Sequence, residues 1–181
     1  MSKNIVVTGG SGFIGSHLVD FLIKKKYKVT VIDNLSTGKK ENLKNSINRI
    51  RFIKADITNT KKIIIYFKKV DYVFHLAALA DIVPSIQKPD EYFKSNVEGT
   101  LSVLECCRKN KIKKLIYAAS ASCYGLPKNF PTNEKEKINP MYPYALTKWL
   151  GEELILHWTK IYKIKANSLR LFNVYGPRSR S

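Results

Sequence analysis

The chain has 181 residues, of which 44% are hydrophobic, so it can form one domain with a substantial core but not two full domains. No apolar run reaches the roughly 18 residues of a membrane span, and strand-like sequence begins at residue 4, so we expect a cytoplasmic protein rather than a membrane or secreted one. The formal net charge of +18 would suit a nucleic-acid partner, but the lysines are spread over almost every predicted helix and turn and form no basic stripe. We therefore expect no nucleic-acid partner. The positive electrostatic field would instead favour small anionic substrates.

Short apolar segments alternate with helical patterns along the chain. The apolar segments are rich in Ile, Val, Phe and Tyr and mostly too apolar for strands with one solvated face, so they predict buried parallel strands. Their alternation with helices requires right-handed crossovers and helices on both faces of one sheet. The sequence thus predicts an α/β fold, a doubly wound Rossmann sheet, with strands at 4–8, 27–33, 50–57, 71–78, 113–120 and 165–172 and helices near 13–25, 60–69, 90–109 and 143–163.

The first predicted strand is followed by the glycine-rich segment GGSGFIGS. Gly9, Gly12 and Gly15 lie between this strand and an amphipathic helix, which is the context of a dinucleotide-binding loop. Gly9 permits a sharp turn, Gly12 lets the backbone approach a pyrophosphate, and Gly15 lets the helix pack closely on the strand. The phosphates would lie at the helix N-terminus, where free N–H groups and the helix dipole favour anions. A glycine turn with a purely structural role is the alternative.

Two aspartates follow the second and third predicted strands. Asp33 ends the second strand, where its carboxylate can accept hydrogen bonds from an adenosine ribose and would repel a 2′-phosphate. We therefore expect NAD rather than NADP, although Lys39 and Lys40 nearby leave NADP open. Asp56 is expected beside the adenine edge, with a helix cap or a solvated turn as the alternative.

The three cysteines give no sign of a metal site. Cys106 and Cys107 are adjacent in a predicted helix, Cys123 stands alone, and none has CxxC or Cys/His ligand spacing. We expect reduced, buried thiols and no bound metal.

A candidate catalytic pair lies in the segment YPYALTKWLGEE. Tyr144 and Lys148 are four residues apart, so they project from one helix face. A free phenol titrates at about 10, and a neighbouring ammonium together with a cationic nicotinamide would lower its pKa toward useful base strength. Ser120 ends a predicted parallel strand, at the sheet edge where open α/β sheets bind ligands, and could hydrogen-bond a substrate oxygen.

The C-terminal part of the chain combines a loop, a helix and a strand. Residues 124–143 are dense in proline, asparagine and charge and predict a surface loop. The sequence ends at NVYGPRSRS, after a strand that ends at Phe172, where another helix or strand would normally follow. We expect one NAD-binding Rossmann domain over residues 1–181, as the N-terminal part of a longer protein.

Several short motifs together carry a family resemblance over essentially the whole chain. The sequence resembles the extended short-chain dehydrogenase/reductases that act on nucleotide sugars, and is most similar to the UDP-sugar 4-epimerases, such as the UDP-glucose and UDP-N-acetylglucosamine 4-epimerases. The motifs, in chain order, are TGGSGFIG, DN, ADI, HLAA, NVEGT, YAASASCYG, YALTK and RLFNVYGPR.

Carried over position by position, the resemblance implies binding and catalytic residues. Asn96 matches a position near the cofactor, with an ordinary polar helix residue as the alternative, and His75 matches a strand-end position rather than a catalytic one. The catalytic residues would be Ser120, Tyr144 and Lys148, and the substrate contacts would be Ser85, Ser120, Tyr144 and Asn173. The residues lining NAD would be Gly9, Gly12, Phe13, Ile14, Gly15, Asp33, Asn34, Asp56, Ile57, Ala77, Ala78, Asn96 and Lys148.

The resemblance also implies a mechanism. Tyr144 as phenolate would take the proton of the sugar 4-hydroxyl while hydride moves from C4 to NAD, with Ser120 bridging the oxygen and Lys148 holding the ribose. The 4-keto sugar would then rotate and receive the hydride on its other face, so that no net redox change occurs. The relatives also imply a C-terminal substrate lobe, which is largely missing here, and a homodimer built on the helices near 90–109 and 143–163.

Other functions stay open. Nucleotide-sugar dehydratases and decarboxylases resemble the chain too, but they carry an acidic residue one or two positions after the equivalent of Ser120, where this sequence has Ala121 and Ser122. A reductase of the same superfamily is a further alternative. A non-catalytic NAD-binding protein is another, because a chain without the substrate lobe is expected to bind NAD and to be weak or inactive alone.

Overall fold

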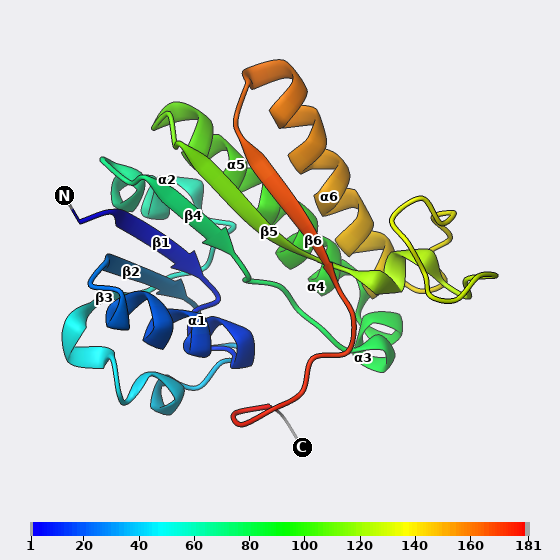
Figure 1. The fold of residues 1–181 in the computed structure, drawn as a ribbon, viewed down its shortest axis with the longest axis horizontal. Helices are drawn as coiled ribbons and strands as arrows, with labels where there is room; N and C mark the ends of the chain where they lie inside the picture. The colour runs from blue at the N-terminus through cyan, green and yellow to red at the C-terminus, as the bar shows by residue number, and fades with distance from the viewer. Residues whose placement is uncertain (1, 180–181) are drawn as a thin grey trace.

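A single sheet of six parallel strands forms the centre of the computed structural model, which describes residues 2–179 (Figure 1). The strands follow the order β3-β2-β1-β4-β5-β6. The first three strands thus extend the sheet to one side of β1, and the last three extend it to the other side. This is the doubly wound Rossmann arrangement that the sequence predicts. The strands are β1 (Asn4–Thr8), β2 (Lys28–Asp33), β3 (Ile50–Lys54), β4 (Tyr72–His75), β5 (Lys114–Ser120) and β6 (Ala166–Leu171).

Two strands end earlier than the sequence predicts. Strand β3 ends at Lys54 rather than at residue 57, and β4 ends at His75 rather than at residue 78. The apolar residues after each strand leave the sheet at its carboxyl edge, where Ala55, Ile57 and Ala77 line a pocket instead of pairing with a neighbour. The apolar residues that extended the two predicted strands thus line the pocket instead of pairing in the sheet.

The predicted helices are present, with interruptions, and the structure adds one short α-helix and several 3-10 turns. The expected helix at 60–69 is a short helix followed by a 3-10 turn, and the expected helix at 90–109 passes through a π-helical segment. A short helix at 82–87 was not predicted, since it is brief and contains Pro84. The helical elements are α1 (Phe13–Lys24), η1 (Lys40–Leu43), η2 (Ile47–Arg49), α2 (Thr60–Ile63), η3 (Ile64–Phe67), α3 (Ile82–Gln87), α4 (Pro89–Tyr92), η4 (Phe93–Glu98), α5 (Gly99–Lys109), η5 (Ala121–Tyr124) and α6 (Pro143–Tyr162).

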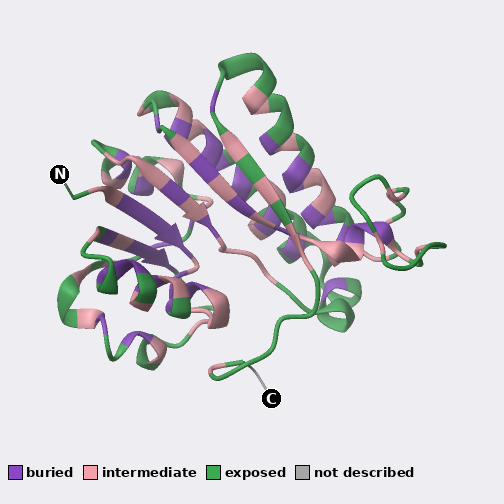
Figure 2. Cartoon of the chain, in the orientation of Figure 1, coloured by how far each residue is buried: buried purple, intermediate pink, exposed green. Residues whose placement is uncertain are grey.

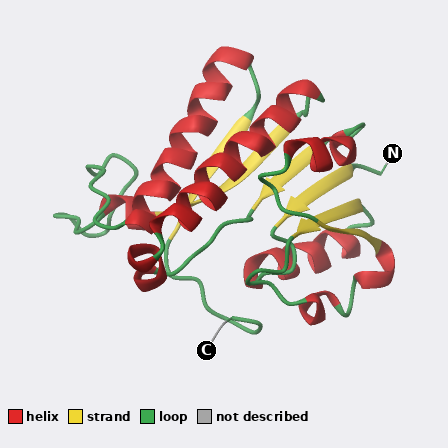
Figure 3. Cartoon of the chain, turned by 180° about the vertical axis from the view of Figure 1, so that it is seen from behind, coloured by secondary structure: helices red, strands yellow, loops and turns green. Residues whose placement is uncertain are grey.

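Helices cover both faces of the sheet and create two hydrophobic clusters. Helix α1 packs on one face with Val7, Val19 and Val31 at the centre of the contact. Helices α5 and α6 cross the other face side by side (Figure 3), where Leu104 and Leu115 are fully buried. Figure 2 shows the central strands largely buried and the chain after β6 largely exposed. Within residues 2–179, no helix has the length and hydropathy to cross a bilayer.

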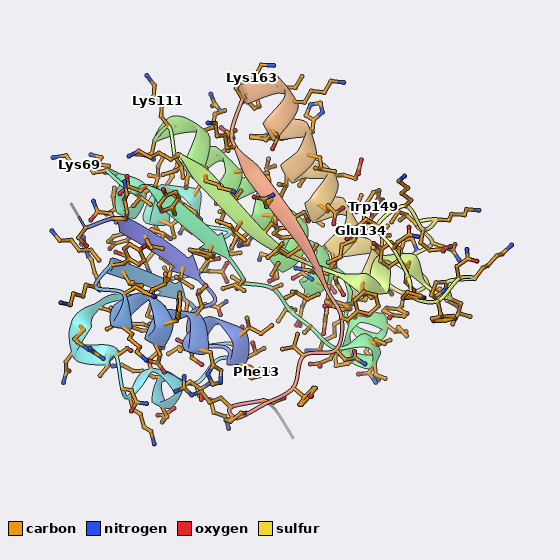
Figure 4. All side chains as sticks on the ribbon, in the orientation of Figure 1. Phe13, Lys69, Lys111, Glu134, Trp149 and Lys163 are labelled. Carbon is orange, nitrogen blue, oxygen red and sulfur yellow. The ribbon has the colours of Figure 1, made fainter. Side chains whose placement is uncertain are left out.

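Lysines with left-handed backbone conformation lie at the turns between helices and strands. Lys26, Lys69, Lys111 and Lys163 have φ values of 61°, 59°, 52° and 57°, and each precedes one of the strands β2, β4, β5 and β6. Three of them are labelled along one border of the molecule in Figure 4. The carbonyl ends of helices favour cations, so these positions suit lysine electrostatically although glycine is the usual residue there.

Candidate functional site

The glycine loop connects β1 to α1 at the carboxyl edge of the sheet. Gly9 has a φ of +70°, and a Cβ atom there would lie 2.6 Å from the backbone nitrogen of Ala77. A Cβ atom on Gly15 would lie 2.2 Å from the carbonyl oxygen of Gly9. At Gly12 the nearest atom would be the Gly9 oxygen at 3.3 Å. Gly9 and Gly15 are thus required by packing, whereas a Cβ atom on Gly12 would meet one close atom only, so the packing requirement there is weaker.

Asp33 ties the glycine loop to the end of β2. Its carboxylate accepts hydrogen bonds from the backbone N–H groups of Ser11 and Leu35, each at 2.8 Å, and the residue is buried. Each carboxylate oxygen keeps a free acceptor position for a ribose hydroxyl. The ammonium group of Lys40 lies 5.7 Å from the centroid of the Phe52 ring.

Asp56 and Asn34 form a second polar wall. The side-chain amide of Asn34 donates to Asp56 at 2.8 Å, and the backbone N–H and hydroxyl of Thr58 donate to the same carboxylate at 2.9 and 2.7 Å. Burial raises the pKa of Asp56, but these hydrogen bonds outweigh it and hold the pKa below its usual value. The N-cap of α2 is Asn59, so Asp56 is a turn and pocket residue rather than a helix cap.

These residues surround one pocket at the point where strand order reverses. It contains eight of the residues expected to bind NAD, and it adds the segment 36–38 and Ser95, which the sequence reasoning missed. A short run of small residues directly after Asp33 is the signal that could have identified 36–38. The lining is Gly9, Gly12, Ile32, Asp33, Asn34, Ser36, Thr37, Gly38, Ala55, Asp56, Ile57, Leu76, Ala77, Ala78 and Ser95.

The other expected cofactor residues lie around this pocket rather than in its wall. Phe13 and Ile14 begin α1 and are partly buried, and Gly15 is buried under Gly9. Asn96 is buried, and its amide is already engaged: it accepts from the N–H of Leu79 at 2.8 Å and donates to the Leu79 carbonyl and to Thr147, both at 3.0 Å. Asn96 thus holds the β4–α3 connection against α6.

Ser120 and Tyr144 meet at the carboxyl edge of β5. The hydroxyl of Ser120 lies 2.7 Å from that of Ser122 and accepts from the Ser122 N–H at 3.2 Å. Burial raises the pKa of Tyr144, while a hydrogen bond with Ser120 lowers it less strongly, so the net pKa is above the usual value. The expected lowering of this pKa does not occur in the protein by itself, since burial dominates.

Lys148 lies one helical turn after Tyr144 and is buried. Its ammonium group donates to the carbonyl oxygen of Ala118 and lies 4.4 Å from the centroid of the Tyr117 ring. Burial lowers the pKa of Lys148 to about 7, and the nearby carboxylate of Glu152 only partly opposes this shift. Burial therefore makes the protonated form of Lys148 less stable than that of an exposed lysine.

The two residues expected to contact only the substrate have different surroundings. Ser85 is fully buried in α3, where its hydroxyl donates to the Ile82 carbonyl at 2.6 Å, so it does not face an open pocket. Asn173 is exposed in the segment that follows β6. Among residues 2–179, no group of three or more His, Cys, Asp or Glu side chains could hold a metal ion.

The segment after β6 folds back over the first turns of α1. His17 Nε2 lies 2.8 Å from the Pro177 carbonyl oxygen, and Arg178 pairs with Asp20 at 2.7 Å. Gly176 lies beside the ring of Phe13, which is labelled next to this segment in Figure 4. The last described residues thus lie against α1, close to the glycine loop.

A buried ionic network, also missed from the sequence, connects α6 to β6. Arg170 pairs with Glu152 at 2.7 Å and donates to the hydroxyl of Tyr124 at 2.8 Å, and Ser168 donates to Glu152 at 3.0 Å. Arg170 also lies 5.6 Å from the Trp149 ring. This network fixes the helix that carries Tyr144 and Lys148 against the last strand.

The comparison with known families accounts for this arrangement. Residues 5–181 match the NAD dependent epimerase/dehydratase family. The chain belongs to that family.

Solved structures of family members superpose closely on the chain. UDP-N-acetylglucosamine 4-epimerase of Methanobrevibacter ruminantium, in complex with UDP-N-acetylmuramic acid, is 44% identical with a TM-score of 0.93, covering 99% of this chain and 57% of that one. UDP-glucose 4-epimerase of Thermotoga maritima with UDP-glucose is 41% identical with a TM-score of 0.93, covering 97% and 57%. UDP-glucose 4-epimerase of Brucella ovis with NAD is 34% identical with a TM-score of 0.89, covering 95% and 52%. The chain thus spans little more than half the length of these relatives.

Proposed function

We propose that this chain is the NAD-binding part of an epimerase that inverts C4 of a UDP-sugar through a 4-keto intermediate. The observation that carries the proposal is that Ser120, Tyr144 and Lys148 come together at the end of β5, on the strand next to the one whose end lines the pocket. The similarity to UDP-sugar 4-epimerases supports the substrate class.

The pocket fits NAD. Gly12 precedes the first residue of α1, where the dipole and free N–H groups favour a pyrophosphate. The buried hydroxyl of Ser11 in the same loop has no hydrogen-bond partner, so the loop retains an unused polar group. Asp33 would accept from the adenosine ribose and repel a 2′-phosphate, which favours NAD over NADP. When bound, NAD supplies a reversible hydride acceptor.

The residues of the chain would supply the proton chemistry. Tyr144 would take the proton of the sugar 4-hydroxyl, and the Ser120 hydroxyl would hold the same oxygen in place. Lys148 would hold the nicotinamide ribose and, with the positive nicotinamide ring, lower the pKa that burial raises at Tyr144. The cofactor is regenerated, so no external reductant would be needed.

The sequence after Ser120 favours epimerisation over elimination. Residues 121–124 form a 3-10 turn in which Ala121 and Ser122 provide no carboxylate. A dehydratase or decarboxylase would need an acid/base group there. A reductase or a non-catalytic NAD-binding protein would share the same fold, so only an activity assay distinguishes these two functions from epimerisation.

The whole protein's assembly is proposed from the same comparison. The outer faces of α5 and α6 expose Leu101 and Leu156, 39% and 49% accessible. Two copies of this helix pair could bury these side chains against each other, so we propose a homodimer. The UDP part of the substrate would need residues outside the Rossmann sheet.

Binding and turnover test the proposal separately. The purified chain is titrated with NAD and NADP, and we expect tighter binding of NAD; Asp33→Ser should narrow that preference. The full-length epimerase, of which this chain is the proposed NAD-binding part, is then incubated with NAD and with UDP-glucose, UDP-galactose or their N-acetyl forms. No reductant is added, and the products are examined for 4-epimers. Tyr144→Phe should lose turnover and keep NAD affinity. Absence of NAD binding would overturn the proposal, and full turnover by Tyr144→Phe would exclude Tyr144 as the base.

A further inference from the structure

His75 occupies a fully buried position between two threonine hydroxyls. Its Nδ1 atom lies 2.7 Å from the Thr8 hydroxyl on β1, and its Nε2 atom lies 3.0 Å from the Thr100 hydroxyl on α5. The Tyr117 ring packs 5.5 Å away. Burial, reinforced by the positive charge of Lys148, lowers the pKa of His75 to about 3. The imidazole is therefore neutral, with one donor and one acceptor.

The neighbouring hydrogen bonds determine which nitrogen carries the proton. The Thr100 hydroxyl donates its only proton to the carbonyl oxygen of Asn96 at 2.6 Å, so toward His75 it must accept. Nε2 is thus the protonated nitrogen, and Nδ1 must accept from Thr8. The Thr8 hydroxyl in turn accepts from the backbone N–H of Ala77 at 3.4 Å. All donors point the same way, from Ala77 through Thr8, His75 and Thr100 to Asn96.

The two ends of this chain of hydrogen bonds lie at the cofactor pocket and at helix α6. Ala77 lines the cofactor pocket, and its backbone is so close to Gly9 that a Cβ atom there would lie 2.6 Å away. At the other end, Asn96 bonds to Thr147, which is adjacent to Lys148 on α6. The hydrogen-bond chain therefore connects the pocket wall to the helix that carries Tyr144 and Lys148.

We propose that His75, as its neutral Nε2–H tautomer, is a positioning residue that sets the cofactor-pocket wall at Ala77 in register with the catalytic helix through this directional hydrogen-bond chain. The proposal rests on the proposed NAD site and deepens it. Thr8, His75, Thr100 and Asn96 are at most 1% accessible, so they cannot touch cofactor or substrate and can act only through geometry.

The tautomer is tested without any ligand. In protein labelled with ¹⁵N at histidine, His75 should show a protonated Nε2 and an unprotonated Nδ1, unchanged from pH 8 to pH 5. His17 and His157, which are exposed, give the other two histidine signals in the same spectrum, against which that of buried His75 is compared. A proton on Nδ1, or a normal titration of His75, would overturn the proposal.

The positioning role is tested by paired substitutions and NAD binding. Thr8→Val keeps the shape and removes the hydroxyl, and we expect NAD to bind about tenfold more weakly, whereas Thr8→Ser should stay near wild type. His75→Phe should weaken NAD binding similarly, and combining it with Thr8→Val should add little, because both interrupt one chain. Ser102→Ala, on the same helix as Thr100, is the control: it removes a 2.7 Å hydrogen bond to Thr60 of α2 and should lower stability without changing NAD affinity.

The outcomes separate this proposal from the proposed function. If wild-type protein does not bind NAD, the proposed function fails, and the proposed role of His75 fails with it, whatever the tautomer. If NAD binds but Thr8→Val and His75→Phe bind it as tightly as wild type, or weaken it additively, His75 has no positioning role while the proposed function stands.

Discussion

The ammonium group of Lys148 lies 4.4 Å from the centre of the Tyr117 ring and donates to the carbonyl of the next residue, Ala118. Both partners belong to β5, so the charge faces the sheet in the protein without ligand. A buried ammonium stabilised by one carbonyl and one aromatic face costs free energy, because desolvation is only partly compensated. The catalytic helix therefore holds a group that weakens the fold.

Lys148 should make stability depend on pH in a defined direction. Burial lowers its pKa in the folded protein to about 7, from an ordinary value of 10.5. Below pH 7 the lysine is protonated in both the folded and the unfolded state, so the full cost of burying its charge is present. Above pH 7 only the unfolded state binds the proton, so the free energy of unfolding rises with pH toward 10.5. The stability advantage of Lys148→Met should be constant below pH 7 and then shrink by about 1.4 kcal/mol per pH unit. Urea unfolding of both proteins from pH 6 to 9.5 measures this, and a constant difference would contradict it.

Ser120 should influence Tyr144 before any substrate is present. The hydrogen bond with Ser120 lowers the pKa of Tyr144, opposing burial. Ser120→Ala should therefore raise this pKa further, and saturating NAD should lower it in the wild type. Tyrosine labelled with ¹³C at the ζ carbon reports each titration, with Tyr144→Phe identifying the signal. Ser122→Ala is the matched control, because it leaves the Ser120 hydroxyl in place. A pKa unchanged by Ser120→Ala would remove Ser120 from the site.

The strands, the glycine loop and the helix that carries Tyr144 and Lys148 could be predicted from sequence because each depends on local signals. The glycine spacing, the strand-end aspartate and the tyrosine–lysine helix all involve short separations. Partners distant in sequence were not predictable, such as the pairing of Glu152 with Arg170 or the occupation of the Asn96 amide by Leu79 and Thr147. The predicted lowering of the Tyr144 pKa assumed a bound cationic nicotinamide and stays a prediction; in the protein alone burial, which a sequence does not show, raises this pKa more than the Ser120 hydrogen bond lowers it.

The glycines of the loop should separate folding from binding. A Cβ atom at Gly15 would lie 2.2 Å from the Gly9 oxygen and 2.8 Å from Gly10 Cα, so Gly15→Ala must displace α1 and should destabilise by about 2 kcal/mol or more. At Gly12 the closest atom is 3.3 Å away, so Gly12→Ala should unfold near wild type but bind NAD much more weakly. Thermal unfolding and NAD titration on the same samples test this contrast. Equal losses of stability in both variants would contradict it.

The left-handed lysines predict a simple stabilisation. Lys163 follows α6 with φ 57° and ψ 26°, a conformation that glycine adopts without the strain a Cβ atom causes. Lys163→Gly should stabilise the protein by about 0.5–1 kcal/mol. Lys160→Gly, three residues earlier inside the helix, should destabilise it by about 1 kcal/mol. A destabilised Lys163→Gly variant in chemical unfolding would show that the lysine side chain matters more there than backbone strain.

The buried pair between Glu152 and Arg170 should be costly to break from one side. Their side chains are 5% and 18% exposed, so Arg170→Leu leaves a carboxylate in the interior with only Ser168 to solvate it. We expect a loss of about 3–5 kcal/mol for Arg170→Leu. The double variant Glu152→Leu/Arg170→Leu should recover most of it, because no unpaired charge remains, although Tyr124 loses its donor. Unfolding free energies of wild type, the single variants and the double variant test this in one cycle. If the double variant is as unstable as the sum of the singles, the two side chains have no interaction energy, and the cost of Arg170→Leu does not come from the unpaired charge.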